Sequence, residues 1–248
     1  HLRAVAQLRL NLPPEINRAL QTTDGASGLV YSLLLSDDDG VRRKQLDILR
    51  TRLSPDAQAE TMALIPGVTA LGARYKLALA EFAVPALREN DLDEHGAFHQ
   101  VMQQLVECDG SIGLFEYALM KMIARRLQAH FFGVQTGGPR FGRVQDVLPE
   151  CAVLLSALAH VGSDNDETAA RKAFAKGVEF LDAQNISIQF LTRSEWDLSK
   201  VDAALTRLAG YHDPLKRNVL LACGKTVVSN GRVNEREAEL LRAIADAL

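Results

Sequence analysis

The chain has 248 residues, of which 47% are hydrophobic and 24% are charged, so it can bury a core of its own without disulfides or structural metal. A formal net charge of −3 and the lack of a long basic run argue against nucleic acid and anionic lipid as principal partners. No apolar run approaches the roughly 18 residues of a membrane-spanning helix, so we expect no direct membrane insertion by this segment.

Three widely spaced cysteines, Cys108, Cys151 and Cys223, lie in apolar helical contexts and form no C-x-x-C pair. This pattern predicts buried free thiols in a reducing compartment. The chain begins with His1-Leu-Arg-Ala, which has neither an initiator methionine nor the profile of a signal peptide. We therefore expect a segment of a longer protein.

Helical periodicity and helix-type punctuation dominate the first half of the chain. Ser54-Pro55 is a cap followed by a proline in the first turn, and Asp91-Leu-Asp-Glu94 has the spacing of a capping box. Pro66 should end one helix, and Pro85 should interrupt the next. The expected helices are a short one opened by 13–15, then 24–35, 41–53, 55–65, 66–87 (long or broken), 91–106 and one that ends near 132.

Glycine and proline cluster after residue 132, so we place a linker at 133–143 between a first half, 1–132, and a second half, 144–248. An extended, packed connector is expected over 185–193. Helices are expected over 144–160, from the Ser163–Asp166 cap to 181, over 198–209, over 214–229 and from 234 onward. The predicted fold is therefore all-α, with about ten to twelve helices in two similar halves that pack together.

Two stretches 121 residues apart, 106–127 and 227–248, follow the same pattern of helix end, tight turn and new helix. A duplicated fold is the natural interpretation. Conservative pairs at this offset are Asp109/Asn230 and Ile112/Val233, and the identical pairs are Val106/Val227, Gly110/Gly231, Glu116/Glu237, Leu119/Leu240, Ile123/Ile244, Ala124/Ala245 and Leu127/Leu248.

Turn and cap chemistry explains this motif. We expect Gly110 and Gly231 to end a helix, Ile112 and Val233 to seal the turn against the core, and Asn234 with Glu237 to form a capping box. Glu116 should serve the next helix N-terminus by itself. The alternative is a calcium loop, which the same Asp-Gly-x-Ile-x-x-x-Glu pattern partly matches. Leu105 and Thr226 stand where its first ligand belongs, so we expect no calcium site.

His95 and His99 lie four residues apart on a predicted helix, a spacing that can present two imidazoles to one zinc ion. Gly96 replaces the glutamate that a hydrolytic zinc helix needs directly after its first histidine. His95 also falls on the apolar stripe of its helix, which favours a packing role. The pair is therefore kept only as a weak metal candidate.

Two acidic clusters, Ser36–Gly40 and Ser163–Glu167, directly precede basic helices, so we expect helix caps there in preference to metal or acid–base sites. No Gly-x-Ser-x-Gly elbow or Walker loop occurs, and no residue is predicted to be catalytic. Trp196 is either a partner anchor or a residue buried beneath the connector, and we expect burial.

Around Asp109-Gly110 and Asn230-Gly231, the sequence resembles the TerB-like helical domains. Over nearly its full length, it is similar to the region that follows the protease domain in some bacterial HtpX-like membrane zinc metallopeptidases. The order of segments carries this resemblance: Leu12-Pro-Pro-Glu, Leu29-Val-Tyr-Ser-Leu-Leu-Leu, Val41-Arg-Arg-Lys-Gln-Leu, Pro85-Ala-Leu-Arg, Asp109-Gly110, Pro214-Leu-Lys-Arg and the closing segment from Glu237.

The resemblance implies a non-catalytic accessory domain on the cytoplasmic side of an inner-membrane protein. Zinc would be held in the parent's protease part, since no His-Glu-x-x-His occurs here, and this segment would need no cofactor. Its expected partners are other proteins, the parent's protease domain or a second copy. Two alternatives stay open: a free-standing TerB-like stress scaffold that binds metal ions or proteins, and an enzyme in which His95 or His99 meets carboxylates from other helices.

Overall fold

The computed structural model describes residues 9, 11–72, 75–108, 114–131, 140–163, 166–181, 187–230, 233 and 235–248. Within these residues the chain forms twelve α-helices and no strand, and a single pair, Arg140 and Tyr211, makes an isolated β-bridge. The predicted all-α fold class is confirmed.

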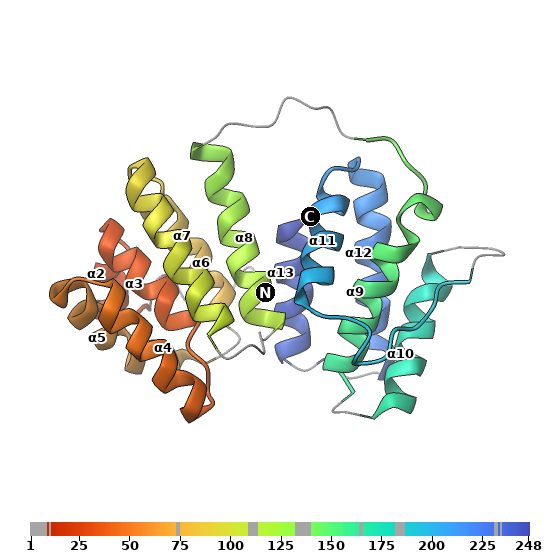
Figure 1. Cartoon of the computed structure of the whole chain (residues 1–248), viewed down its shortest axis with the longest axis horizontal. Helices are drawn as coiled ribbons and strands as arrows, with labels where there is room; N and C mark the ends of the chain where they lie inside the picture. The colour runs from red at the N-terminus through yellow and green to blue at the C-terminus, as the bar shows by residue number, and fades with distance from the viewer. Residues whose placement is uncertain are drawn as a thin grey trace. The chain divides into compact units, whose positions relative to one another are not determined.

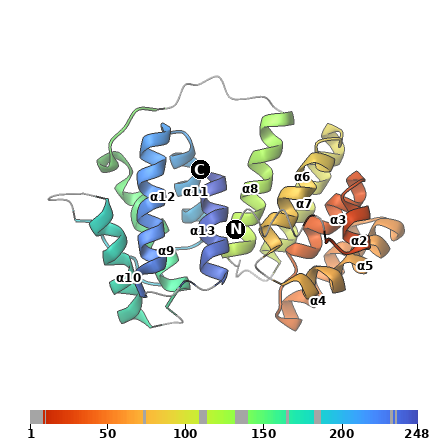
Figure 2. The same ribbon diagram turned by 180° about the vertical axis from the view of Figure 1, so that it is seen from behind.

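The helices divide between two compact units, residues 1–135 and 136–248. Figures 1 and 2 show the helices of each unit from opposite sides. Most of the predicted linker, 133–143, lies outside the described residues, so the predicted boundaries stay a prediction.

Helix α3 lies at the centre of the first unit, where it packs against α2, α5, α6 and α7. Its side chains from Leu29 to Leu34 are at most 5% exposed. The helices of this unit are α2 Pro14–Ala19, α3 Thr23–Leu33, α4 Asp39–Arg52, α5 Pro55–Leu71, α6 Lys76–Leu87, α7 Leu92–Glu107 and α8 Leu114–Phe131.

Side-chain caps begin four helices of this unit, α3, α4, α5 and α7. Asp91 Oδ1 accepts from the Glu94 amide at 2.8 Å, and Glu94 Oε2 accepts from the Asp91 amide at 2.9 Å, so the predicted capping box is confirmed. In the first acidic cluster, Asp38 Oδ1 accepts from the Gly40 and Val41 amides, both at 2.9 Å. These backbone donors lower the pKa of Asp38, so the carboxylate serves as a helix cap.

The expected break at Pro66 is wrong, because α5 continues through this proline to Leu71. The missing amide of Pro66 would have bonded the carbonyl of Met62, and Met62 is 42% exposed, so water can take that carbonyl. The chain instead breaks at Gly72, whose φ of +83° suits glycine. Likewise, Pro85 lies inside α6 without ending it.

Gln45 ties three helices of the first unit together. Its Nε2 donates to the carbonyls of Leu34 at 3.0 Å and Leu105 at 2.9 Å, and its Oε1 accepts from the Ser36 amide at 2.8 Å. The side chain is 3% exposed. The buried side-chain amide of Gln45 thus donates two hydrogen bonds and accepts one, and these bonds fix the end of α3 against α4 and α7.

Helix α9 is the core helix of the second unit and packs against α10, α11 and α12. The 18-residue window Val144–Val161 is long and apolar enough to cross a membrane by composition alone, and 56% of it is buried inside the fold. The elements are η2 Val144–Val147, α9 Leu148–Val161, α10 Glu167–Phe180, α11 Leu198–Ala209, α12 Asp213–Val227, η3 Val228–Asn230 and α13 Glu235–Ala247.

The last helices of the two units follow the same spacing as the sequence repeat. α12 begins 121 residues after α7, and α13 begins 121 residues after α8. The units differ before that point, because the first has α5 where the second has an extended connector before α11. Duplication of the whole unit stays a prediction.

Close approach of α3 to α5 depends on Gly28. A Cβ added at Gly28 would lie 2.7 Å from Thr61 Oγ1, whereas a Cβ at Gly96 in α7 would meet nothing within 4 Å. We expect Gly28→Ala to lower the free energy of unfolding by about 1–3 kcal/mol through overpacking. Gly96→Ala is the control and should raise it by about 0.5–1 kcal/mol. Urea titrations followed by circular dichroism test this, and equal effects of the two changes would contradict it.

Candidate functional site

Much of the repeated turn motif lies outside the described residues: Asp109, Gly110, Ile112, Gly231 and Asn234, together with the side chain of Asn230. Their predicted roles stay predictions. Val233 is 48% exposed, so the expectation that it seals the turn against the core is wrong. The two motif glutamates differ, because Glu116 is half-buried and Glu237 is 3% exposed.

Glu237 lines a small cavity in the second unit, which we call the Glu237 cavity. Its volume is about 40 Å³. One water molecule needs at least about 10–15 Å³ of cavity volume, so the cavity can hold one or a few of them. The walls come from the end of α9, from α10, from the α12–η3 junction and from α13. The lining residues are Leu158, Ala159, Gly162, Ser163, Ala169, Ala173, Thr226, Ser229 and Glu237.

Two glycines allow the helices to approach closely around this cavity. A Cβ at Gly162 would overlap Glu237 Oε1, and a Cβ at Gly177 would overlap Thr226 Oγ1. The Thr226 hydroxyl donates to the Ala222 carbonyl at 3.2 Å within α12. The buried carboxylate therefore depends on a glycine at the C-terminal end of α9, a requirement that the repeat motif alone does not reveal.

The Glu237 cavity combines one carboxylate with three hydroxyls, from Ser163, Thr226 and Ser229. Such a set can hold ordered water and can link the helices that carry it. Across the residues that the structure describes, no group of three or more His, Cys, Asp or Glu side chains is arranged to hold a metal ion. A volume of about 40 Å³ is also far below the roughly 300 Å³ of a small-molecule site.

His95 is packed in the core, as its place on the apolar stripe predicted. It is 7% exposed, and its ring is stacked on Phe131 with centroids 4.2 Å apart and an interplanar angle of 21°. Burial lowers the pKa of His95, and the neighbouring His99 lowers it further. The structure thus places His95 and His99 together, but among described residues it does not bring carboxylates to them as a ligand group.

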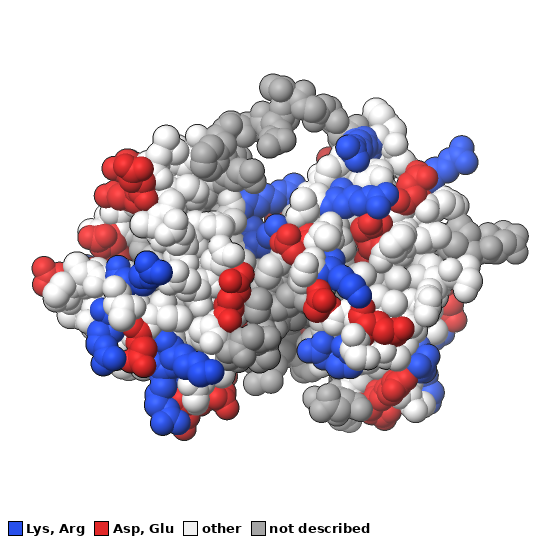
Figure 3. Space-filling model, viewed as in Figure 1, with Lys and Arg blue, Asp and Glu red and all other residues white. Residues whose placement is uncertain are grey.

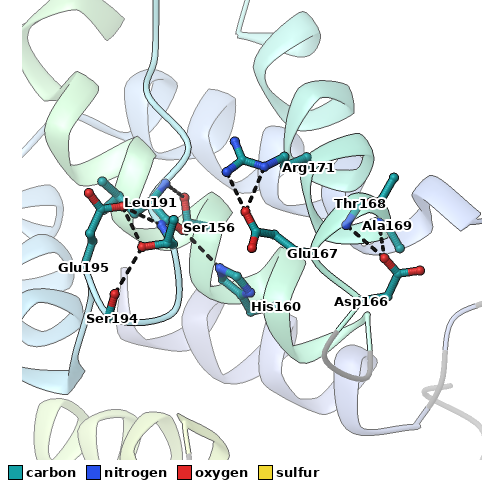
Figure 4. A network of polar contacts seen from close by, with 11 residues as sticks. Ser156, His160, Asp166, Glu167, Thr168, Ala169, Arg171, Leu191, Ser194 and Glu195 are labelled. Atoms are coloured by element: carbon teal, nitrogen blue, oxygen red, sulfur yellow. Dashed lines mark hydrogen bonds and ion pairs between the residues drawn. The ribbon is translucent and has the colours of Figure 1, made fainter.

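A second cluster of polar and aromatic groups holds the extended connector, residues 187–196, against α9 (Figure 4). Ser156 Oγ accepts from the Leu191 amide at 3.0 Å, and His160 Nε2 lies 3.0 Å from the Leu191 carbonyl oxygen. The two side chains stand one turn apart on α9. Together they pair both backbone groups of one connector residue, as a neighbouring strand would.

Aromatic rings complete this attachment. His160 lies 5.1 Å from Phe190 and 6.1 Å from Trp196 between ring centroids. Guanidinium groups cover both connector rings, Arg171 over Phe190 at 4.6 Å and Arg193 over Trp196 at 4.2 Å. Trp196 is 6% exposed, so its predicted burial beneath the connector is confirmed. Ser156 and His160 were not predicted as functional residues; their four-residue spacing on an apolar helix was the available signal.

The second acidic cluster caps α10 through Asp166. Its Oδ1 accepts from the amides of Thr168 at 2.9 Å and Ala169 at 3.1 Å. Residues 164 and 165 lie outside the described residues. At the end of the connector, Glu195 accepts from the amide and hydroxyl of Thr192 at 2.7 and 2.8 Å, and these donors lower the pKa of Glu195. Asp166 thus begins α10, and Glu195 closes the local turn that starts at Thr192.

The predicted burial of the thiols is confirmed for two of the three cysteines. Cys151 and Cys223 are 0% exposed and free, while Cys108 is half-buried. Burial raises the pKa of Cys151 to about 12, with a smaller contribution from Glu150, and burial also raises the pKa of Cys223. Neither thiol is disposed to act as a nucleophile, because the thiolate is the reactive form.

Gly162 and Gly210 provide a matched test of the Glu237 cavity, since both are C-caps with right-handed helical φ and ψ. An alanine Cβ at Gly162 meets the Glu237 carboxylate, while the nearest atom at Gly210 is 3.5 Å away. We expect Gly162→Ala to lower the free energy of unfolding by about 1–3 kcal/mol. Gly210→Ala should leave it within about 1 kcal/mol. Urea unfolding followed by Trp196 fluorescence measures both changes. If Gly162→Ala left the free energy of unfolding unchanged, the close approach of Glu237 to Gly162 would be contradicted.

The connector attachment predicts a second effect on the same signal. Ser156→Ala removes the acceptor of the Leu191 amide and should cost about 0.5–1.5 kcal/mol. It should also shift Trp196 emission to the red, because the connector that covers Trp196 loosens. Ser194→Ala is the control, since that exposed hydroxyl contacts only Thr192 among the described residues. If both changes left the emission unaltered, the hydrogen bond would not hold the connector.

Comparison of the chain with protein-family models, with curated proteins and with solved structures gives no match. The fold therefore rests on the structure itself. The TerB-like and metallopeptidase resemblances rest on the order of sequence segments alone.

Proposed function

We propose that the chain is a helical protein-interaction domain that performs no catalysis of its own. One observation carries this proposal: the side chains that the sequence offers for chemistry are used to hold helices and turns in place. His95 is stacked in the core, Asp38 and Asp166 cap helices, and Glu237 is buried beside the end of α9. Because these side chains are used for packing and capping, we assign the function to the exposed surfaces of the helices.

Among those surfaces, α4 differs most from the chain as a whole. It carries five basic and two acidic side chains, although the net charge of the chain is −3. Figure 3 shows Lys and Arg side chains, with Asp and Glu between them, over this helix at the lower left. Arg43, Lys44 and Arg50 are exposed, and Gln45 and Leu49 bury the opposite face. A partner with an acidic surface fits this helix.

The context of the domain is the second part of the proposal. The order of segments resembles the region after the protease domain of HtpX-like membrane zinc metallopeptidases, which supports an accessory role beside a zinc site held elsewhere in the parent. In that setting the domain would recruit a substrate or partner on the cytoplasmic side. The proposed contact is made by side chains of α4, and the reaction belongs to the protease part.

Site-specific photo-crosslinking in cells tests the proposal. A benzoyl-phenylalanine replaces Arg43 on α4, and the matched control replaces Lys172, an exposed basic residue of α10 in the second unit. We expect one discrete adduct from position 43, joined to a polypeptide that contains His-Glu-x-x-His or to its protein substrate. Position 172 should give little adduct. Equal labelling from both positions would contradict the proposal that α4 is the contact surface.

A hydrolysis assay tests the non-catalytic assignment separately. The purified chain, incubated with unfolded casein and zinc, should release no peptides above the rate of a heat-denatured sample. Chelator-sensitive hydrolysis that follows the chain through purification would overturn the assignment.

A further inference from the structure

Two histidine rings pack on one phenylalanine, Phe131, where α7 begins and α8 ends. The His95 ring lies nearly parallel to the Phe131 ring at 4.2 Å, and the His130 ring stands edge-on to it at 5.0 Å and 89°. His99, one turn further along α7, acts electrostatically on His95. These rings join the first turns of α7 to the last turn of α8.

The surroundings of His95 disfavour a positive charge. Its side chain is 7% exposed, and burial together with His99 lowers the pKa of the imidazole. His95 is also the fourth residue of α7, near the positive end of the helix dipole. The acidic groups nearby, Asp91 and Glu94, accept from each other's backbone amides in the capping box.

Two charged side chains, on α4 and α8, make contacts that do not involve His95. From α4, Arg52 Nε donates to Gln104 at 3.0 Å, toward the far end of α7. On α8, Arg126 pairs with Glu81 of α6 at 3.5 Å. From α3, the ring of Tyr31 packs on Phe98 at 5.6 Å. His99 lowers the pKa of His95, and it does so less than burial does.

We propose that the stack of His95 on Phe131 is an acid-sensitive latch between α7 and α8. Uncharged His95 holds the stack on Phe131 closed at neutral pH, and proton uptake opens the end of α8.

The direction of the effect follows from the lowered pKa of His95 in the folded chain. An unfolded histidine titrates near 6.5, so the unfolded state binds more protons than the folded state below that pH. The contribution of the neutral stack to stability is therefore complete above about pH 6.5 and is lost as the pH falls through and below it.

Hydrogen exchange of the full chain, compared at pH 7.5 and 5.5 after correction for intrinsic rates, tests the latch. We expect peptides from the start of α7 and the end of α8 to lose protection several-fold at pH 5.5, while α12 in the second unit keeps its protection. His95→Phe retains a ring on Phe131 but cannot take a proton, so it should abolish the acid response. His212→Phe, in the second unit, should leave the response intact.

An acid response that persists in His95→Phe, or a wild-type chain without one, would overturn the latch. A measurement on the wild-type chain covers the case in which the variant fails to fold. The imidazole signals of His95, followed by NMR across pH 4.5–8.5, should report a pKa below the ordinary value of about 6.5. A value at or above 6.5 would refute the proposal.

Discussion

Each unit is built around one apolar helix, and each of these helices carries a buried serine whose hydroxyl must be paired. In α3, Ser32 Oγ donates to Gly28 at 2.7 Å and contacts the Thr61 carbonyl of α5 at 3.4 Å. In α9, Ser156 Oγ accepts from Leu191 of the connector at 3.0 Å. Because an unpaired buried hydroxyl is costly, Ser32 bonds within its own helix and to α5, and Ser156 bonds to the connector. The first unit meets this need with a helix, and the second meets it with an extended segment.

Local signals predicted most of the helices and their beginnings. The capping box at Asp91 and the caps at Ser54, Asp38 and Asp166 depend only on residues within a few positions of one another, so the sequence alone shows them. The break near Gly72 was missed because Pro66 is the stronger local signal. Whether a proline ends a helix depends on which donor bonds to the carbonyl that loses its amide partner. That in turn depends on which side of the helix faces water.

The candidate sites depend on contacts between helices, and these could not be predicted in the same way. Glu237 was expected to serve a cap, and nothing local indicates that its carboxylate lies against Gly162, 75 positions earlier. Ser156 and His160 resemble ordinary positions of an apolar helix until the connector arrives beside them. His95 was predicted correctly as a packing residue because periodicity reports burial, yet its stacking partner Phe131 lies on another helix. The periodicity of apolar residues thus indicates which side chains are buried, and the packing of the helices determines which of them contact one another.

The burial of Cys151 and Cys223 has a practical consequence for handling the protein. Both thiols lie in helices of the second unit and stay protonated at neutral pH, so alkylating reagents and peroxide can reach them only when that unit opens. The half-buried Cys108 belongs to the first unit. The rates at which Cys151 and Cys223 become modified would therefore report the opening of the second unit, read by mass spectrometry from a single unaltered sample.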